Sequence, residues 1–273
     1  MIFVDSHVHI YDCFDVDILL DSALNNFQKA AKKHNTTGQA SVYVLLLTET
    51  KNESWFERSL ANFNSTDQEN GNISKNWRGA VIEQSDVLLA SRNDSPEAKI
   101  YIVAGHQIVT KEKIEVLALY SRQTISDGLS LAETVNLAVQ ENAIPVLPWG
   151  VGKWFGTRGK TIQSFLDSSG TGRLYLGDNG GRPGSWPTPT LFHVTKKKGI
   201  SVLPGTDALP LERETSRVGS FGFYLDDSLS DGEAPCNYLK NVLLAQDPAV
   251  THFGRLQNSS LFLLNQLRLR FSS

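Results

Sequence analysis

Two histidines occupy alternate positions near the start of the chain, in the run Asp-Ser-His-Val-His. The apolar residues 2–4 before them predict a short strand. Side chains two apart on an extended segment point the same way, so we expect His7 and His9 to project together from the end of this strand. Two imidazoles in that arrangement are suited to bind one divalent metal ion. The alternative of a pair of surface or core histidines stays open, because short motifs also occur by chance.

Other side chains capable of chemistry follow later apolar runs. In barrels built from β-α units the loops after the strands form the site, so these residues are expected at one end of the fold. His106 in particular offers a third imidazole. The residues, each with the run that precedes it, are Glu49 after residues 42–47, His106 after residues 100–104 and Asp207 after residues 201–203.

Two glycine-rich segments, residues 150–153 and 177–184, carry a second signal. Glycine lets backbone N–H groups approach an anion closely, and Arg matches phosphate or carboxylate with two parallel hydrogen bonds. We therefore predict an anionic ligand here, with an aromatic wall to its pocket. Flexible loops with solvated charges, and a tryptophan that only packs, are the open alternatives. The residues predicted to bind the substrate are Lys153, Arg158, Arg182 and Trp149.

Apolar strand-like runs alternate with helical periodicity along the chain, which favours a parallel sheet covered by helices. Strands are expected at residues 2–4, 42–47, 80–82, 100–104 (paired with 116–120), 144–147, 174–176 and 201–203. Helices are expected at residues 16–33, 130–142, 189–198 and 261–271. We predict an α/β fold, a TIM-like (β/α) barrel of seven strands. It would form a single domain over residues 1–273, with a polar insertion at about residues 51–78.

Composition narrows the class of protein. The 273 residues are 40% hydrophobic and 20% charged, as in ordinary globular proteins. A net charge of -3 argues against nucleic-acid binding driven by overall charge, and two cysteines are too few for a disulfide framework or a zinc ribbon. No export signal and no apolar run of membrane-spanning length is evident. We expect a cytoplasmic enzyme without nucleic-acid or membrane partners, and the oligomeric state stays open.

Taken together, the motifs resemble the PHP family of metal-dependent phosphoesterases, which are similar in barrel and metal chemistry to the amidohydrolases. Residues 5–9, Asp-Ser-His-Val-His, are similar to the first motif of the family. Residues 205–209, Gly-Thr-Asp-Ala-Leu, are similar to its closing Gly-Ser-Asp-Ala-His motif. The resemblance covers the chain from Met1 to about Tyr224 and implies a metal-binding (β/α) barrel.

Four positions depart from the ligand set of that family. Thr50, Gln107, Trp149 and Leu209 stand where the family has a His, a Glu, the His of a His-Pro pair and a final His. These side chains are poor ligands for a divalent ion. The resemblance therefore implies a reduced centre that holds one zinc, manganese or iron ion, or none. Its ligands would be His7, His9 and Asp207, with Asp12, Glu49, His106, Glu115 and Asp178 as substitutes.

The function implied by the resemblance is a metal-dependent hydrolase, and the basic loops favour a phosphoesterase acting on a small anionic, phosphorylated substrate. Metal-activated water would attack the substrate while Lys153, Arg158 and Arg182 neutralise its charge. Two alternatives stay open: a catalytically degenerate PHP-like barrel that binds a ligand or a partner protein, and an amidohydrolase-type enzyme that cleaves C–N bonds or lactones. The residues predicted as catalytic are Asp207, Glu49 and His106.

Overall fold

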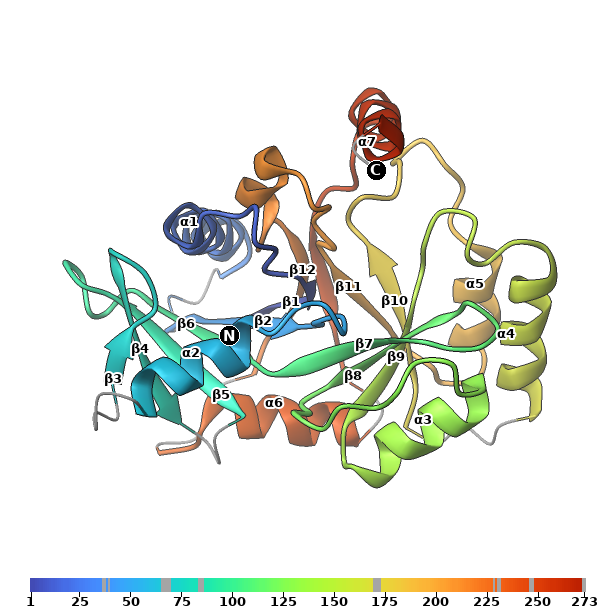
Figure 1. Cartoon of the computed structure of the whole chain (residues 1–273), viewed down its shortest axis with the longest axis horizontal. Helices are drawn as coiled ribbons and strands as arrows, with labels where there is room; N and C mark the ends of the chain where they lie inside the picture. Colours follow the sequence, from blue (N-terminus) through green and yellow to red (C-terminus); the bar gives the residue numbers. More distant parts are fainter. Residues whose placement is uncertain are drawn as a thin grey trace.

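A computed structural model describes residues 1–35, 38, 40–64, 70–82, 86–168, 173–227, 229, 232–245 and 248–271 of the chain. Its strands form one eight-stranded and one five-stranded sheet (Figure 1). The first sheet contains, in spatial order, β13 (Thr251–Gly254), β12 (Phe221–Leu225), β1 (Ile2–Val8), β2 (Val42–Leu47), β6 (Lys99–Val103), β5 (Val87–Arg92), β4 (Trp77–Ile82) and β3 (Asn70–Asn72). The second contains β11 (Val202–Gly205), β10 (Tyr175–Asn179), β9 (Ile144–Pro148), β8 (Glu115–Leu119) and β7 (Gly105–Val109).

Helices cover the outer faces of both sheets (Figure 1). The helix α3 begins with the capping box expected from its sequence, in which Ser130 and Glu133 bond to each other's backbone N–H groups. The helices are α1 (Val16–His34), α2 (Trp55–Asn64), α3 (Leu131–Gln140), α4 (Gly156–Ser168), α5 (Thr190–Lys196), α6 (Pro235–Leu244) and α7 (Ser259–Phe271), with a 3-10 helix, η2 (Glu212–Arg217).

The predicted TIM-like barrel is wrong. Over the described ranges the strands pair in two separate sheets of mixed direction, and helices do not alternate regularly with strands. Antiparallel pairing joins β3 to β4, β4 to β5 and β5 to β6, and it also joins β7 to β8 and β8 to β9. The predicted pairing of residues 100–104 with 116–120 is wrong for the same reason, since β6 pairs with β2 and β5. Apolar runs of four to six residues look alike in parallel strands and hairpins, so periodicity alone did not separate the two.

The two sheets approach each other at two seams. At the first, only Ala104 separates β6 in one sheet from β7 in the other. Glu49 N donates to Gly105 O at 3.0 Å, and Gln107 N donates to Glu49 O at 2.9 Å. A Cβ on Gly105 would lie 2.3 Å from Leu47 O, so this crossing requires glycine.

The second seam joins β11 to β1. Asp207 N donates to His7 O at 2.8 Å, and a Cβ on Gly205 would lie 2.3 Å from His7 N. The buried Asp5 carboxylate accepts hydrogen bonds from Thr206 N at 2.7 Å, from Gly219 N at 2.9 Å and from the Thr206 hydroxyl. Burial raises the pKa of Asp5 to about 6, although these hydrogen bonds oppose the shift. Asp5 therefore ties β1 to two segments that follow it by more than 200 residues.

The two faces of the second sheet contact two different hydrophobic clusters. Along β9, Val146 packs in the cluster shared with Leu203 of β11 and with α6, whereas Leu147 packs on the opposite face against α4. Such alternation is the expected period of a strand. It means that neighbouring residues at the ends of β9 and β10 point toward different environments.

In the part of the chain that the structure describes, no helix combines the length and the apolar character needed to cross a lipid bilayer.

The close approach at Gly205 predicts a large effect of a single methyl group. Gly205→Ala should lower the free energy of unfolding by about 1–3 kcal/mol, because the added Cβ overlaps the His7 backbone. Gly184→Ala is the control, since its Cβ would meet Leu256 Cβ at 3.6 Å and Gln257 O at 3.7 Å. Urea unfolding measures both. Equal stabilities of the two variants would contradict the close approach of Gly205 to the His7 backbone.

Removal of the Asp5 carboxylate should also destabilise the fold. Asp5→Ala leaves the buried donors of Thr206 and Gly219 without an acceptor, at a cost of about 1–3 kcal/mol for each donor. Asp12→Ala serves as the comparison, because Asp12 is exposed and pairs only with the exposed Arg58. We expect that variant to unfold within about 0.5 kcal/mol of the wild type in the same urea titration.

Candidate metal centre

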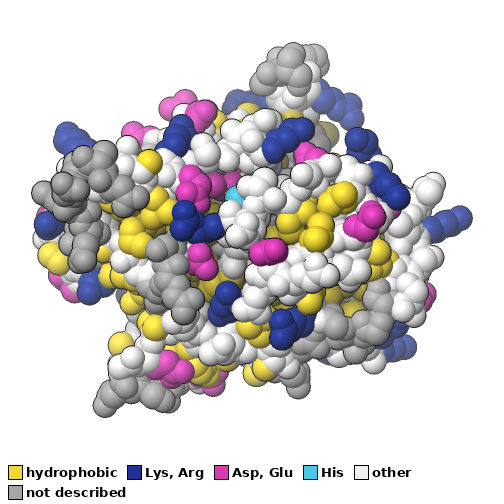
Figure 2. Space-filling model, turned by 60° about the horizontal axis from the view of Figure 1, so that its bottom comes forward, with side chains coloured by type: hydrophobic (Ala, Val, Ile, Leu, Met, Phe, Trp, Pro, Cys, Tyr) yellow, Lys and Arg dark blue, Asp and Glu magenta, His cyan; other side chains and the backbone are white. Residues whose placement is uncertain are grey.

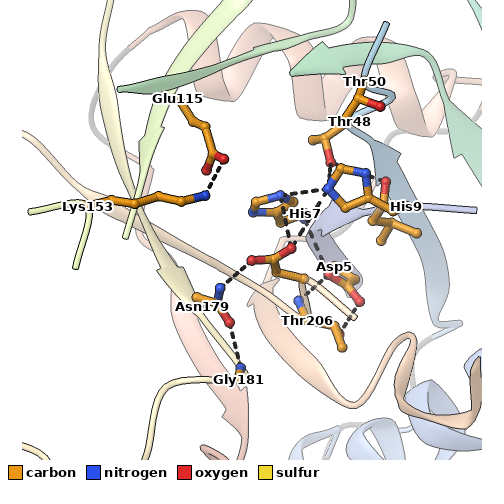
Figure 3. A network of polar contacts seen from close by, with 12 residues as sticks. Asp5, His7, His9, Thr48, Thr50, Glu115, Lys153, Asn179, Gly181 and Thr206 are labelled. Atoms are coloured by element: carbon orange, nitrogen blue, oxygen red, sulfur yellow. Dashed lines mark hydrogen bonds and ion pairs between the residues drawn. The ribbon is translucent and has the colours of Figure 1, made fainter. Parts of the chain in front are cut away.

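Three side chains converge where β1 and β11 meet. His7 Nε2 lies 3.2 Å from His9 Nε2, and Asp207 Oδ1 lies 3.5 Å from the first nitrogen and 3.8 Å from the second. Both histidines are buried, and the Asp207 side chain is 22% exposed. In Figure 3 the imidazoles of His7 and His9 lie next to each other. All three ligand atoms lie within 4.8 Å of one another, which is the spacing of groups that hold one metal ion.

Asp207 reaches this position through an uncommon backbone conformation. Its φ of 45° lies in the left-handed region, which Asp adopts more readily than most residues other than glycine. The hydrogen bond from its N–H to His7 O holds the backbone in place. Strain of this kind in non-glycine residues concentrates at functional sites.

Two of the three ligand candidates, His9 and Asp207, are each oriented by a further side chain. His9 Nδ1 is 2.9 Å from Glu53 Oε2, which also accepts from Thr50 N at 3.0 Å, and the ring of Tyr11 stacks on His9. Asp207 Oδ2 accepts from Asn179 Nδ2, whose own Oδ1 accepts from Gly181 N at 2.6 Å. These contacts leave His9 Nε2 and Asp207 Oδ1 directed at the same point.

The ionisation of the cluster is set by burial and by neighbouring charges. Burial lowers the pKa of His7. Burial also opposes protonation of His9, but the hydrogen bond to Glu53 and the charge of Asp207 outweigh it and raise the pKa of His9. Burial would raise the pKa of Asp207, yet the two histidines hold it below its usual value. The site therefore keeps an ionised carboxylate beside two imidazoles.

An ion pair lies next to the cluster. The Lys153 ammonium contacts Glu115 Oε1, and Figure 3 shows both side chains directed toward His7. Of the residues that we predicted to bind the substrate, Lys153 is the one that the structure brings to the metal candidates.

The other predicted basic residues make contacts elsewhere. Arg158 Nη2 donates to Gly152 O at 2.7 Å. Arg182 forms two hydrogen bonds of 2.8 Å with Asp178, and both side chains of this pair are buried. The guanidinium of Arg182 also lies 6.0 Å from the centre of the Trp149 ring. Arg158 and Arg182 are thus engaged with protein groups away from the cluster.

Trp149 belongs to the hydrophobic cluster on the outer face of the second sheet, together with Leu147 and Leu176. Asp178, paired with Arg182, and Asn179, bonded to Asp207, are neighbours on β10 and point to opposite faces. Trp149 therefore packs on the face opposite to the metal candidates. In the resemblance Trp149 stands at the position of a ligand His, and its packing does not agree with that alignment.

Glu49 and His106 are also not joined to the cluster. Glu49 Oε1 accepts from Phe56 N at 2.9 Å at the start of α2, and burial raises the pKa of Glu49. His106 Nε2 is buried without a hydrogen-bond partner among the described residues. The backbones of these two residues form an isolated bridge at the first seam. Their catalytic roles stay predictions that these contacts do not support.

Sequence reasoning missed the residues that orient the ligands. Glu53 lies in the segment that we expected to be a polar insertion, where no periodic pattern marks individual residues. Asn179 follows Asp178, which we had considered as a substitute ligand. Strand alternation was the available signal, because it allows only one of these two neighbours to face Asp207.

No family model matches the chain, and no curated protein matches it. Two solved structures are similar in outline. PsfC from Pseudomonas syringae PB-5123 has 13% sequence identity and a TM-score of 0.49, over 99% of this chain and 98% of that chain. Endonuclease Q, in a complex with a 27-mer duplex that carries an abasic lesion at the active site, has 10% identity and a TM-score of 0.44. That match covers 89% of this chain and 55% of Endonuclease Q.

Both TM-scores lie below 0.5, so neither structure transfers an activity or a ligand to this chain. The exclusion of a nucleic-acid partner does not hold either, because it rested on the net charge of the chain, which averages over the whole surface. The similar structure of Endonuclease Q itself contains a DNA duplex. On the face shown in Figure 2, basic and acidic side chains of this chain are intermixed.

Proposed function

We propose that the protein is a metal-dependent hydrolase that binds one divalent ion through His7, His9 and Asp207. The observation that carries this proposal is the convergence of two imidazole nitrogens and one carboxylate oxygen within 3.2–3.8 Å. The finer assignment is a phosphoesterase related to the PHP family, acting on a small anionic, phosphorylated substrate. The resemblance of residues 5–9 and 205–209 to PHP motifs supports it.

The donor set fits such an ion. Two nitrogens bound to tetrahedral zinc at about 2.05 Å would be about 3.3 Å apart, and His7 Nε2 and His9 Nε2 are 3.2 Å apart. The contact with Glu53 occupies His9 Nδ1 and leaves the lone pair of Nε2 for a metal. Two histidines and one carboxylate suit zinc, manganese or iron, and three protein ligands leave a position for substrate or water.

The chemistry of the site follows from these residues. A divalent ion bound here would supply a water of lowered pKa and polarise a phosphoryl oxygen. Glu53 and Asn179 hold His9 and Asp207 in position. Lys153 offers a positive charge to an anionic substrate, and Glu115 holds the ammonium next to His7. A phosphoryl substrate would thus meet cationic groups on two sides.

A second candidate function is a protein that binds its ligand without catalysis. It is favoured by the placement of Glu49 and His106 outside the cluster, since Asp207 is then the one predicted catalytic residue that lies in it. An activity measurement separates the two functions.

Metal content tests the centre directly. Protein purified without chelator should contain about one divalent ion per chain, and the double variant His7→Ala/His9→Ala should contain none, because it loses two of three ligands. His193→Ala is the control, since His193 is an exposed residue of α5. Elemental analysis of all three proteins gives the answer. A metal-free wild type, or equal metal in the double variant, would remove these residues from the proposal.

Hydrolysis tests the reaction class. The metal-loaded wild type should hydrolyse p-nitrophenyl phosphate or its bis ester, and Asp207→Asn should reduce kcat/KM at least about 100-fold, because the metal contributes several kcal/mol of charge stabilisation. Release of p-nitrophenol measures both proteins. A wild type that binds metal and cleaves neither ester would favour the binding function.

Glu53 should act on the metal through His9. Glu53→Ala is expected to weaken metal affinity about 10–100-fold, the usual effect of losing an orienting partner of a ligand histidine. Glu53→Gln should retain most of the affinity, since its amide oxygen can still accept from Nδ1–H. Glu57→Ala is the matched control, because Glu57 pairs with Arg122 instead. Competition with a chromogenic chelator measures these affinities, and identical values for Glu53→Ala and Glu57→Ala would contradict the role of Glu53.

A further inference from the structure

The ion pair of Lys153 and Glu115 faces the metal candidates from the second sheet. Glu115 is the first residue of β8, and Lys153 lies in the loop that follows β9. Their side chains are 15% and 37% exposed, respectively. Figure 3 shows the Lys153 side chain extended toward His7, with its ammonium beside Glu115. The pair thus combines a position facing the cluster with access from solvent, as a substrate-binding group requires.

The loop is shaped to deliver this side chain. Lys153 N donates to Gly150 O at 3.0 Å and closes a tight turn. A Cβ on Gly150 would lie 2.6 Å from Lys153 Cδ and 3.2 Å from Cγ, so the aliphatic stem lies directly across the glycine. Arg158 donates to Gly152 O and fixes the far side of the same turn. The direction of Lys153 therefore depends on the absence of a side chain at residue 150.

Lys153 is also the cation that is positioned to act on the cluster. Figure 3 shows its ammonium directed toward His7. Arg217, by contrast, is bound through Nη1 to Glu214 Oε2 at 2.6 Å. Arg182 is held by Asp178 on the other face of the sheet.

Among the described residues, the group with the spacing to hold a metal ion is His7, His9 and Asp207. Thr50, Gln107 and Leu209 replace metal-binding side chains in the resemblance, and Trp149 packs on the opposite face. In two-metal phosphoesterases the second ion neutralises charge on the transferred group and clamps its oxygens. A site with one metal must obtain that positive charge from the protein.

We infer that the Lys153 ammonium serves as the second cation of this centre and that the site takes a phosphoryl group between the metal position and Lys153. Glu115 holds the ammonium in place before the substrate arrives, and Gly150 gives the lysine stem its path. This inference rests on the proposed function, because it requires a metal ion at His7, His9 and Asp207. It adds that Lys153 takes the place of a second ion and provides the phosphate affinity of the centre.

The test uses inorganic phosphate and the full chain loaded with metal. Elemental analysis should show one metal ion per chain in the wild type. Isothermal titration calorimetry should show that this protein binds phosphate. Lys153→Met should keep that metal content and lose at least about tenfold in phosphate affinity, the expected effect of losing one charge-assisted hydrogen bond. Lys153→Arg should recover part of the affinity. Lys160→Met is the control, because Lys160 is an exposed residue of α4.

Gly150→Ala provides a second variant that leaves the ammonium in the protein. The added Cβ would displace a flexible stem and not backbone, so stability and metal content should stay unchanged while phosphate affinity falls. Unchanged phosphate affinity in Lys153→Met, loss of metal in that variant, or two ions in the wild type would overturn the inference. A metal-free wild type would instead overturn the proposed function, so the two failures are distinguishable.

Discussion

The close approach of β11 to β1 is the constraint on which the rest of the site depends. Gly205 passes so near the His7 backbone that no side chain fits between them, and Asp207 N is bonded to His7 O two residues later. The buried Asp5 carboxylate fastens the same crossing through Thr206 and Gly219. Backbone geometry alone thus places a carboxylate at two histidines. Without this crossing, Asp207, which follows β11 of the second sheet, would not meet the two histidines at the end of β1 in the first sheet.

Electrostatics at the seam follow from that geometry. Two imidazoles, Asp207 and Glu53 are brought out of water together, and their mutual hydrogen bonds and charges offset part of the cost of burial. A cation at the centre would satisfy the remaining lone pairs of His7, His9 and Asp207 at once. The Lys153–Glu115 pair borders this region with a charge that remains accessible. The proposed metal site and the proposed anion site therefore share one arrangement of side chains.

The second sheet separates residues that lie close in the chain. Asn179 reaches Asp207, while its neighbour Asp178 binds Arg182 on the outer face, where Trp149 packs. Lys153, Arg158 and Arg182, which follow β9 and β10 in the chain, accordingly do not form one cluster of positive charge. Loop position along the chain predicts which end of a sheet a residue occupies, but strand alternation and local hydrogen bonds decide which face it uses.

What the sequence by itself determined is local. The alternate spacing of His7 and His9, the strand at residues 42–47 and the capping box of α3 depend on neighbours in the chain, and the structure has all three. Tertiary structure alone decided the two mixed sheets, the meeting of Asp207 with His7 and the selection of Glu53 and Asn179 as their orienting partners. Those outcomes depend on hairpin pairing and on contacts between residues as many as 214 positions apart, such as Asp5 and Gly219, which no local periodicity records.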